Sequence, residues 1–183
     1  MAAPSQQARA SKHGCDHIFF IGFLGAGKST LARNLGGMFK RRYVDTDRLV
    51  ERRSGRSISR IFRSDGEAAF RVLETRALES LRSERSLLVS CGGGVVETPR
   101  NIELMHQMGP CVYLDGDFDD SLRQIRSLAG RPDFRSREHA ARLYRHRRPL
   151  YQAAADLTVD IRGRSFEDVS YVCADMLLER GLL

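Results

Sequence analysis

Long apolar runs and closely spaced cysteines are both missing from this sequence of 183 residues. No hydrophobic stretch approaches the roughly 18 residues that a membrane-spanning helix requires, because charged residues or glycines interrupt each one. The 4 cysteines are far apart and form no CxxC pair, which argues against a zinc site and against a dense disulfide framework. The sequence therefore predicts a cytoplasmic protein with reduced cysteines and excludes an integral membrane protein.

The first residues also lack the apolar segment of a secretory signal. Residues 1–16 are rich in Ala, Ser and Gln, and we expect them to form a disordered tail. The remaining segment, 17–183, has the length of a single ordinary domain. Hydrophobic residues make up 42% of the whole chain and charged residues 29%, which is typical of a globular protein and not of a disordered or fibrous one.

Lysine is scarce as well. The 30 basic residues include only Lys12, Lys28 and Lys40, so the other 27 are arginines, and the formal net charge is +7. A compositional bias explains most of these arginines, and some of them could meet phosphates, carboxylates or nucleic acid. Composition alone does not distinguish these partners.

Short apolar or β-branched runs alternate along the chain with segments of helical periodicity, which is the pattern of βαβ units and a parallel sheet. We expect five strands, at 17–22, 42–45, 87–91, 111–114 and 157–160. We expect helices at 28–40, 47–54, 57–63, 66–83, 99–108, 118–128, 138–147 and 166–178. This order predicts one three-layer α/β domain that binds its ligands at the carboxyl ends of the strands. Residues 129–137 have no clear periodicity and are predicted to form a mobile loop.

A P-loop follows the first expected strand. The eight residues from Gly22 to Ser29, which Thr30 follows, match the pattern G-x-x-x-x-G-K-[ST] at every fixed position. Glycines allow successive backbone N–H groups to turn towards polyphosphate oxygens, and the helix that follows adds its positive end. Lys28 can reach the β- and γ-phosphates, and the Ser29 hydroxyl can enter the coordination shell of Mg²⁺. The motif predicts a site for a nucleotide with Mg²⁺.

Three further features indicate what could accept a phosphoryl group. Asp45 and Asp47 end the second strand, where one could hold Mg²⁺ through water and the other could take a proton from an acceptor hydroxyl. A helix-capping role stays open for one of them. Gly92–Gly94 follow the third strand, and either form a loose turn or let a polyhydroxylated ligand lie against bare backbone donors. Arg71 precedes Glu74 by three residues, which either fixes the direction of its guanidinium group or makes a solvated surface pair.

Taken in order, the segments GxxGxGKST, VDTD, SGRSISRIF, DGEAAFRVLE, GGG and RRPLY resemble the shikimate kinases, a family of nucleoside-monophosphate-kinase-like P-loop proteins. The resemblance runs from Ile18 to Asp160. It implies a three-layer α/β/α P-loop kinase fold with a five-stranded parallel sheet, an acceptor-binding region at about 47–83 and a mobile lid at about 129–147. The implied activity is ATP-dependent phosphorylation of the 3-hydroxyl of shikimate, which gives 3-phosphoshikimate and ADP on the route to chorismate and the aromatic amino acids.

The resemblance also implies partners and residue roles. The partners are shikimate, ATP and Mg²⁺, without nucleic acid or membrane, and we expect a monomer. Asp47 corresponds to the carboxylate that binds the substrate hydroxyls and serves as the base, while Ser29 and Asp45 would hold Mg²⁺. The implied substrate-binding residues are Asp47, Phe62, Phe70, Arg71, Gly92, Gly93, Gly94 and Arg147. The implied ATP-binding residues are Gly25, Ala26, Gly27, Lys28, Ser29, Thr30, Arg131 and Arg164. Lys28 and the lid residue Arg131 are expected to act in catalysis together with Asp47.

Two features depart from the family pattern. The sequence after Arg131 is Pro-Asp-Phe, where the family usually has Pro-Leu-Leu, and the stretch from there to Arg147 is a few residues short. Arg123 and Arg126 do not fall at the spacing expected of arginines that flank adenine. Lid closure or nucleotide affinity could therefore differ from the family, whereas the acceptor pocket is unaffected.

Two other functions remain to be compared with this one. A sugar-acid kinase of the gluconate type would share the fold, but the Arg71 and Arg147 pair and the VDTD segment argue against it. A catalytically silent module that binds nucleotides or nucleic acid would use the net charge of +7. That module lacks support, because interleaved aromatic residues and a recognised groove motif are missing from the sequence.

Overall fold

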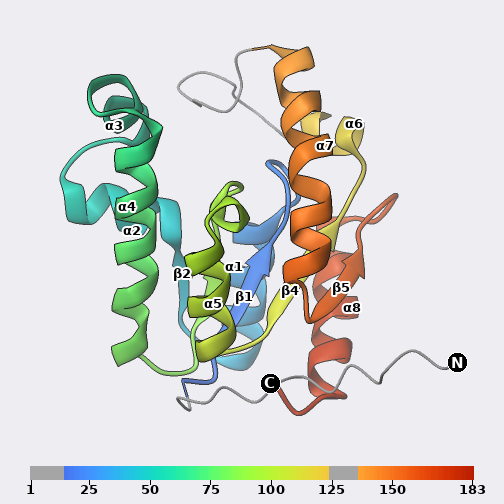
Figure 1. Cartoon of the computed structure of the whole chain (residues 1–183). Helices are drawn as coiled ribbons and strands as arrows, with labels where there is room; N and C mark the ends of the chain where they lie inside the picture. The colour runs from blue at the N-terminus through green and yellow to red at the C-terminus, as the bar shows by residue number, and fades with distance from the viewer. Residues whose placement is uncertain (1–14, 124–135) are drawn as a thin grey trace, which may run out of the picture.

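A five-stranded parallel sheet lies at the centre of the molecule (Figure 1). The structure is a computed structural model, and it describes residues 15–123 and 136–183. The strand order is β2-β3-β1-β4-β5. The strands are β1 (Ile18–Ile21), β2 (Tyr43–Asp45), β3 (Leu88–Ser90), β4 (Cys111–Asp115) and β5 (Leu157–Asp160). The predicted α/β fold with a five-stranded parallel sheet is confirmed, and every strand begins and ends within one residue of its expected position.

Helices connect these strands and cover both faces of the sheet. They are α1 (Lys28–Phe39), α2 (Thr46–Ser54), α3 (Ile58–Ser64), α4 (Gly66–Glu79), α5 (Pro99–Met108), α6 (Phe118–Arg123), α7 (Arg137–Ala154) and α8 (Phe166–Leu178). Two short 3-10 helices are η1 (Ser80–Ser83) and η2 (Val95–Glu97). Within the described residues, no helix is long and apolar enough to cross a membrane.

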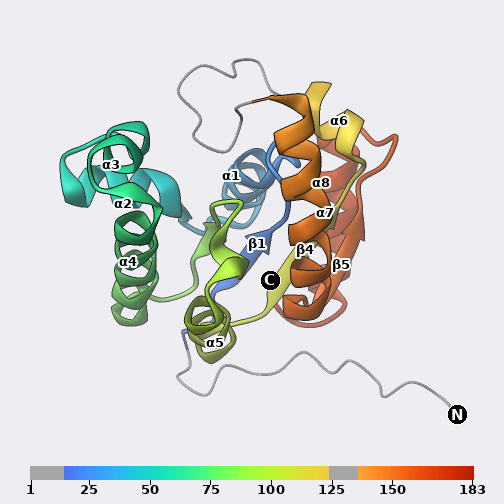
Figure 2. The same cartoon turned by 45° about the horizontal axis from the view of Figure 1, so that its top comes forward.

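The sequence of β1 explains why the sheet is covered on both sides. All four of its residues are buried, and alternate side chains of a strand point to opposite faces. Phe19 and Ile21 pack in a core cluster with residues of α4, α5 and α7, whereas Ile18 and Phe20 pack in a second cluster with residues of α1 and α8. Figure 2 shows the sheet between these two groups of helices. The apolar run therefore makes a central strand with a core on each side.

Two helices differ in extent from the prediction by more than one residue. The helix expected at 138–147 continues to Ala154 through Pro149. Proline removes one intrahelical hydrogen bond, but Pro149 is exposed, and the buried Tyr151 and Ala154 hold the following turn against the sheet. The helix expected at 66–83 is α-helical to Glu79 and continues as η1. The helix expected at 118–128 is described to Arg123, and the rest of it lies outside the described residues.

Candidate active site

The loop between β1 and α1 has the conformation of a phosphate-binding turn. Gly25 and Gly27 have φ angles of 83° and 84°, in the left-handed region that favours glycine. Gly27 is the N-cap of α1, and in the part of the chain that the structure describes no side chain caps this helix and no acidic residue stands in its first turn. The N–H groups and the positive end of α1 therefore face the loop, which is the arrangement that binds phosphate oxygens.

Close packing against α6 and α8 is a second reason why glycine occupies positions 25 and 27. A Cβ atom on Gly25 would lie 2.1 Å from the carbonyl oxygen of Ser121, and one on Gly27 would lie 2.5 Å from the ring of Phe166. The two helices thus form walls beside the loop. The cavity between them has a volume of about 230 Å³, and we call it the nucleotide-side cavity. It is lined by Gly25, Ala26, Gly116, Asp120, Ser121, Arg123, Ile161, Gly163, Arg164, Phe166 and Val169.

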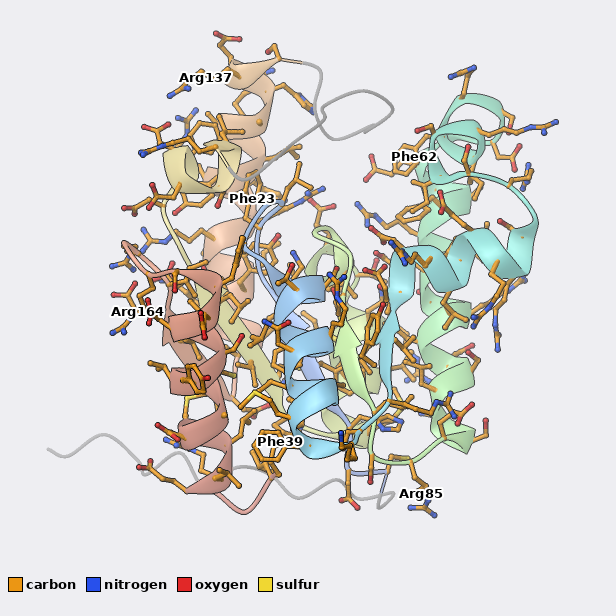
Figure 3. All side chains as sticks on the ribbon, turned by 180° about the vertical axis from the view of Figure 1, so that it is seen from behind. Phe23, Phe39, Phe62, Arg85, Arg137 and Arg164 are labelled. Carbon is orange, nitrogen blue, oxygen red and sulfur yellow. The ribbon has the colours of Figure 1, made fainter. Side chains whose placement is uncertain are left out.

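Of the residues expected to bind ATP, this cavity therefore brings together Gly25, Ala26 and Arg164. Arg123 also lines it, although its spacing did not fit the family pattern. Phe166 was missed, because nothing in the sequence indicates that the first residue of α8 packs on Gly27. Figure 3 shows Arg164 and Phe62 on opposite sides of the P-loop residue Phe23, so residues expected to bind ATP and substrate flank the loop on two sides.

Lys28 and Ser29 lie at the start of α1, between the side of the P-loop that carries Arg164 and the side that carries Phe62. The Lys28 ammonium donates hydrogen bonds to the carbonyl oxygens of Gly22 (2.8 Å) and Phe23 (2.9 Å), which fold the side chain back over the loop. The side chain is buried within the P-loop. The ammonium group is thereby held at the surface of the turn whose N–H groups would receive the phosphates. Thr30 follows in the first turn of the same helix.

The Ser29 hydroxyl donates a hydrogen bond of 2.7 Å to Oδ2 of Asp45 and lies 2.9 Å from the hydroxyl of Ser90. Oδ1 of Asp45 accepts a hydrogen bond of 3.2 Å from the backbone N–H of Arg48 and so caps α2. Asp45 therefore combines the capping role left open by the sequence with a place beside Ser29. Mg²⁺ prefers hard oxygen ligands, and the hydroxyl and carboxylate oxygens gathered here fit that preference.

A second cavity, of about 50 Å³, lies on the other side of the P-loop, and we call it the acceptor cavity. It is lined by Asp47, Ile58, Phe62, Phe70, Arg71, Glu74, Gly92, Gly93 and Gly94. Seven of the eight residues expected to bind the substrate are in this group, and Arg147 is the eighth. The rings of Phe62 and Phe70 are 4.9 Å apart at their centroids, and the guanidinium carbon of Arg71 lies 5.4 Å from the Phe70 centroid. The cavity thus has one aromatic wall and one charged wall.

The glycine run after β3 is closely packed and is not a loose turn. A Cβ atom on Gly92 would lie 2.4 Å from Oδ1 of Asp47, and one on Gly94 would lie 2.3 Å from Nη2 of Arg71. The N–H of Gly92 donates a hydrogen bond of 3.0 Å to the Thr46 hydroxyl, so this donor is already used within the protein. A side chain at either position would displace the Asp47 carboxylate or the Arg71 guanidinium group, because these charged groups lie directly on the backbone.

Arg71 is the centre of an ion-pair network. Its Nη1 lies 3.1 Å from Glu74, and its Nη2 lies 2.8 Å from Glu67 and 2.7 Å from Glu97. The Glu74 side chain is only 1% exposed and that of Arg71 only 15%, which rules out a solvated surface pair. Burial raises the pKa of Glu74 to about 7, although the charge of Arg71 acts in the opposite direction. Glu74 can therefore gain or lose a proton near neutral pH.

Arg147 reaches the same region from α7. Its side chain is 1% exposed, and its Nε donates a hydrogen bond of 3.0 Å to Oε1 of Glu97. A Cβ atom on Gly93 would lie 3.6 Å from Nη1 of Arg147, so this arginine lies behind the glycine run. The hydroxyl of Tyr151, one helical turn further, donates to the carbonyl oxygen of Gly93. No sequence signal indicated Glu97, and Tyr151 was part of the RRPLY segment without an assigned role, because both act through contacts distant in the chain.

The predicted lid is described only in part. Residues 137–147 form the first turns of α7, and its N-cap Ser136 accepts a hydrogen bond from the N–H of His139. Arg131, the lid residue expected to approach the phosphates, lies outside the described residues.

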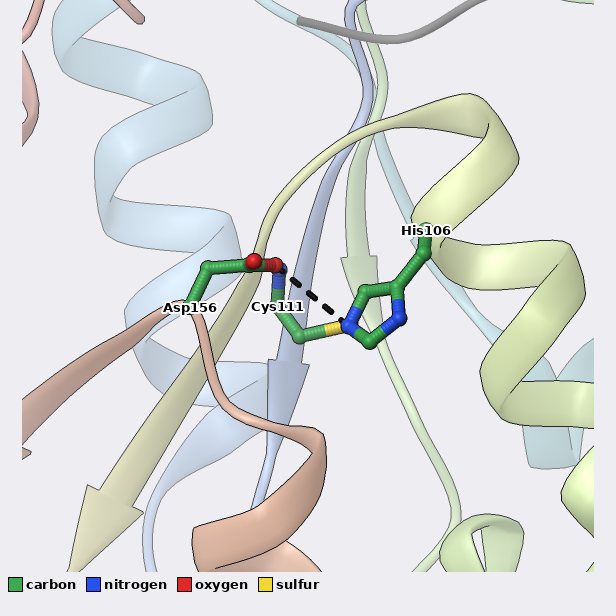
Figure 4. A group of neighbouring side chains, drawn as sticks. All are labelled: His106, Cys111 and Asp156. Atoms are coloured by element: carbon green, nitrogen blue, oxygen red, sulfur yellow. Dashed lines mark hydrogen bonds and ion pairs between the residues drawn. The ribbon is translucent and has the colours of Figure 1, made fainter. Parts of the chain in front are cut away.

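A further group, His106, Cys111 and Asp156, has the types of side chain that bind metals (Figure 4). Its atoms already have partners: Oδ2 of Asp156 accepts a hydrogen bond of 2.8 Å from the Cys111 N–H, and Nε2 of His106 lies 2.9 Å from the Ala154 carbonyl oxygen. Burial raises the pKa of the Cys111 thiol well above its usual value, so the thiol keeps its proton. These contacts connect the start of β4 to the segment before β5, at the amino ends of the strands, whereas the P-loop lies at the carboxyl ends.

Comparison with known proteins gives a consistent result. A model of the family described as "Shikimate kinase" matches residues 24–177. The shikimate kinase of Dehalococcoides mccartyi is 35% identical over 164 residues, which are 88% of this chain and 93% of the relative. That of Synechococcus elongatus is 38% identical over 156 residues, with coverages of 84% and 81%.

Solved structures give the same result. A shikimate kinase from Acinetobacter baumannii in complex with shikimate aligns with a TM-score of 0.85 and 30% identity, over 91% of this chain and 95% of that one. A gluconokinase from Sinorhizobium meliloti aligns with a TM-score of 0.58 and 13% identity, over 91% and 93% of the two chains, and shares the fold alone.

Proposed function

Because the chain belongs to the shikimate kinase family and so transfers the γ-phosphoryl group of ATP to the 3-hydroxyl of shikimate, we propose that the acceptor cavity binds shikimate and the nucleotide-side cavity binds the base of ATP. The observation that carries this assignment is that Asp47, Arg71 and Gly92–Gly94 line one cavity beside the P-loop. The similar Acinetobacter baumannii kinase was solved in complex with shikimate, which supports a shikimate site in this fold.

The acceptor cavity has groups for each part of the substrate. A carboxylate suits Arg71, with Arg147 close behind the glycine run, because guanidinium groups bind carboxylates with two parallel hydrogen bonds. The apolar face of a carbon ring suits the wall formed by Phe62 and Phe70. The hydroxyl groups would then lie near Asp47, at the side of the cavity that the carboxylate does not occupy.

Asp47 is the proposed base. It stands in the first turn of α2, and its Oδ1 lies against the backbone of Gly92. A carboxylate in this position can bind the 3-hydroxyl and accept its proton as the oxygen attacks the γ-phosphorus. The proton then resides on Asp47, and ADP leaves from the P-loop side. Since phosphoryl transfer depends mainly on positioning and charge, the fixed place of Asp47 is as important as its basicity.

The P-loop residues hold the phosphates. The N–H groups at the start of α1 and the Lys28 ammonium would surround the phosphate oxygens and offset the negative charge that develops during transfer. Ser29 and Asp45 are the residues that would hold Mg²⁺, which when bound neutralises charge on the β- and γ-phosphates. Arg131 is proposed to approach the same phosphates from the lid, and the cytoplasmic location and monomeric state also stay predictions.

The experiment is an acceptor panel in a pyruvate kinase–lactate dehydrogenase coupled assay with MgATP. We expect ADP release that depends on shikimate and is absent with gluconate or without acceptor. ADP release with gluconate and not with shikimate would contradict the assignment of the acceptor cavity. Light scattering after size exclusion tests the monomer in the same preparation.

A further inference from the structure

Glu97 joins the two arginines that face the acceptor carboxylate. It is the last residue of η2, three residues after the glycine run. Its Oε2 lies 2.7 Å from Nη2 of Arg71, and its Oε1 lies 3.0 Å from Nε of Arg147. Its side chain is 19% exposed, so solvent screens these contacts only in part. A single carboxylate thus bridges two guanidinium groups.

The two arginines come from different helices. Arg71 is on α4, which packs against α5, while Arg147 is on α7, which packs against η2. Two guanidinium groups of the same charge repel each other when both are partly removed from water. A carboxylate between them offsets that repulsion and links the two helices at the point where they must act together.

We propose that Glu97 is a positioning residue that holds Arg71 and Arg147 at the spacing at which both can bind one substrate carboxylate. The inference rests on the proposed function, which assigns both arginines to that carboxylate. It adds a residue that touches the arginines and not the substrate. The benefit is preorganisation: arginines already held together lose less conformational freedom when the substrate arrives.

The geometry favours such a brace over a carboxylate that occupies the place of the substrate. Among the described residues, those that line the acceptor cavity do not include Glu97. Glu97 binds Arg147 through Nε, whereas Nη1 of Arg147 is the atom that would lie nearest to a Cβ atom on Gly93; on Arg71, Glu97 binds Nη2. A side-on contact at Nε can persist while the terminal nitrogens of a guanidinium group bind a second carboxylate.

The experiment compares Glu97→Gln and Glu97→Ala with the wild type. We expect the KM for shikimate to rise about tenfold, in the middle of the range for residues coupled in one ion-pair network. The kcat and the KM for ATP should stay within about twofold, because neither Asp47 nor the P-loop is touched. Glu97→Asp keeps the charge on a shorter side chain and should recover part of the affinity. Glu103→Gln, which removes an exposed carboxylate from α5, is the matched control and should change nothing.

A KM for shikimate that is unchanged or lower in Glu97→Gln would overturn the proposal, and a lower value would mean that Glu97 competes with the substrate. A loss of kcat with unchanged KM would also overturn it. If Glu97→Ala unfolds, the nearly isosteric Gln variant decides the question by itself. Failure of the proposed function is distinguishable, since the wild type would then show no shikimate-dependent ADP release.

Discussion

The two cavities beside the P-loop are built in different ways. The nucleotide side uses backbone: left-handed turns at Gly25 and Gly27, the open end of α1, and helices packed where a Cβ atom would collide. The acceptor side uses charged side chains that lie on glycine backbone and are held by one another, with Arg71 at the centre. Backbone geometry is insensitive to pH and sensitive to added atoms, whereas an ion-pair network responds to the identity and ionisation of each member.

This difference separates the effects that substitutions should have. Changes on the nucleotide side should alter the affinity for ATP and the stability of the loop together. Changes on the acceptor side should alter the affinity for shikimate and leave the nucleotide largely unaffected. Substitutions on each side therefore test whether the two cavities are separate.

Asp47→Asn should have the largest effect. It removes the proposed base while keeping the size of the side chain, so kcat should fall by about 10²- to 10⁴-fold. Titration calorimetry should show ATP binding that is nearly unchanged, because the P-loop keeps its conformation. Asp175→Asn, at an exposed position of α8, is the control and should have normal kcat. A near-normal kcat for Asp47→Asn would remove Asp47 as the base.

A pair of glycine variants tests most directly whether the nucleotide-side cavity and the acceptor cavity act separately. Gly94→Ala places a Cβ atom against the guanidinium group of Arg71 and should raise the KM for shikimate by about 10- to 100-fold with little change for ATP. Gly27→Ala collides with Phe166 at a positive φ and should weaken ATP binding, with a loss of stability of at least about 1–2 kcal/mol.

The control for this pair is Gly37→Ala, within α1, where a Cβ atom would meet nothing within 4 Å. It should be neutral or slightly stabilising, since alanine is the better helix former. Steady-state kinetics with each substrate varied in turn, together with thermal melts, provides the measurement. If both Gly94→Ala and Gly27→Ala changed the same kinetic constant, the two sides would not be separate.

Arg71→Lys should have a smaller effect of the same kind as Gly94→Ala. Lysine keeps the charge but cannot make two parallel hydrogen bonds, so we expect the KM for shikimate to rise about tenfold with kcat largely retained. Arg76→Lys, at an exposed position of the same helix, is the matched control. An unchanged KM in Arg71→Lys would mean that another group anchors the carboxylate.

Glu74→Gln should have the smallest effect. The effect should be a change in how the stability and the KM for shikimate depend on pH. The pKa of Glu74 is raised to about 7 from 4.5, so its contribution to stability is fully present below the unfolded value and is lost as the pH rises through about 7. The ionised group also adds negative charge beside the substrate carboxylate, so the KM for shikimate should rise a few-fold between about pH 6 and about pH 8.

In Glu74→Gln this rise should be reduced, and urea unfolding should show the variant gaining stability relative to the wild type as the pH increases. Glu79→Gln, at an exposed position at the end of α4, is the control and should keep the wild-type pH profile. A profile of the same slope in Glu74→Gln would assign the pH dependence to another group.

Features that depend on residues close together in the chain could be predicted from the sequence, whereas contacts between residues far apart in the chain could not. The strands and the P-loop were predictable because apolar periodicity and the run from Gly22 to Thr30 are local signals. Asp47 could be located because it follows a strand, and strand ends meet at one edge of a parallel sheet. Glu97 was not predictable, because its partners Arg71 and Arg147 lie 26 and 50 residues away in the chain.

The same reason explains the differences in detail. The predicted helix ended at residue 147, two residues before Pro149, but the burial of Tyr151 and Ala154 against the sheet keeps α7 helical to Ala154. The Arg71 and Glu74 spacing was compatible with a surface pair, and only the packing of α4 against the glycine run buries Glu74 and raises its pKa. Burial depends on neighbours from elsewhere in the chain, and so local spacing cannot reveal it.

The sequence by itself determined the type of fold, the phosphate-binding loop and the family, since these depend on contiguous motifs and on periodicity. The tertiary structure decided how the charges are used. Most of the arginines in this arginine-rich chain could have been solvated, yet Arg147 is buried, Arg71 is held by three glutamates, and Glu97 ties the two together. The physical reason is that an ion pair acquires its strength and its direction from burial and from fixed partners, which only the folded chain supplies.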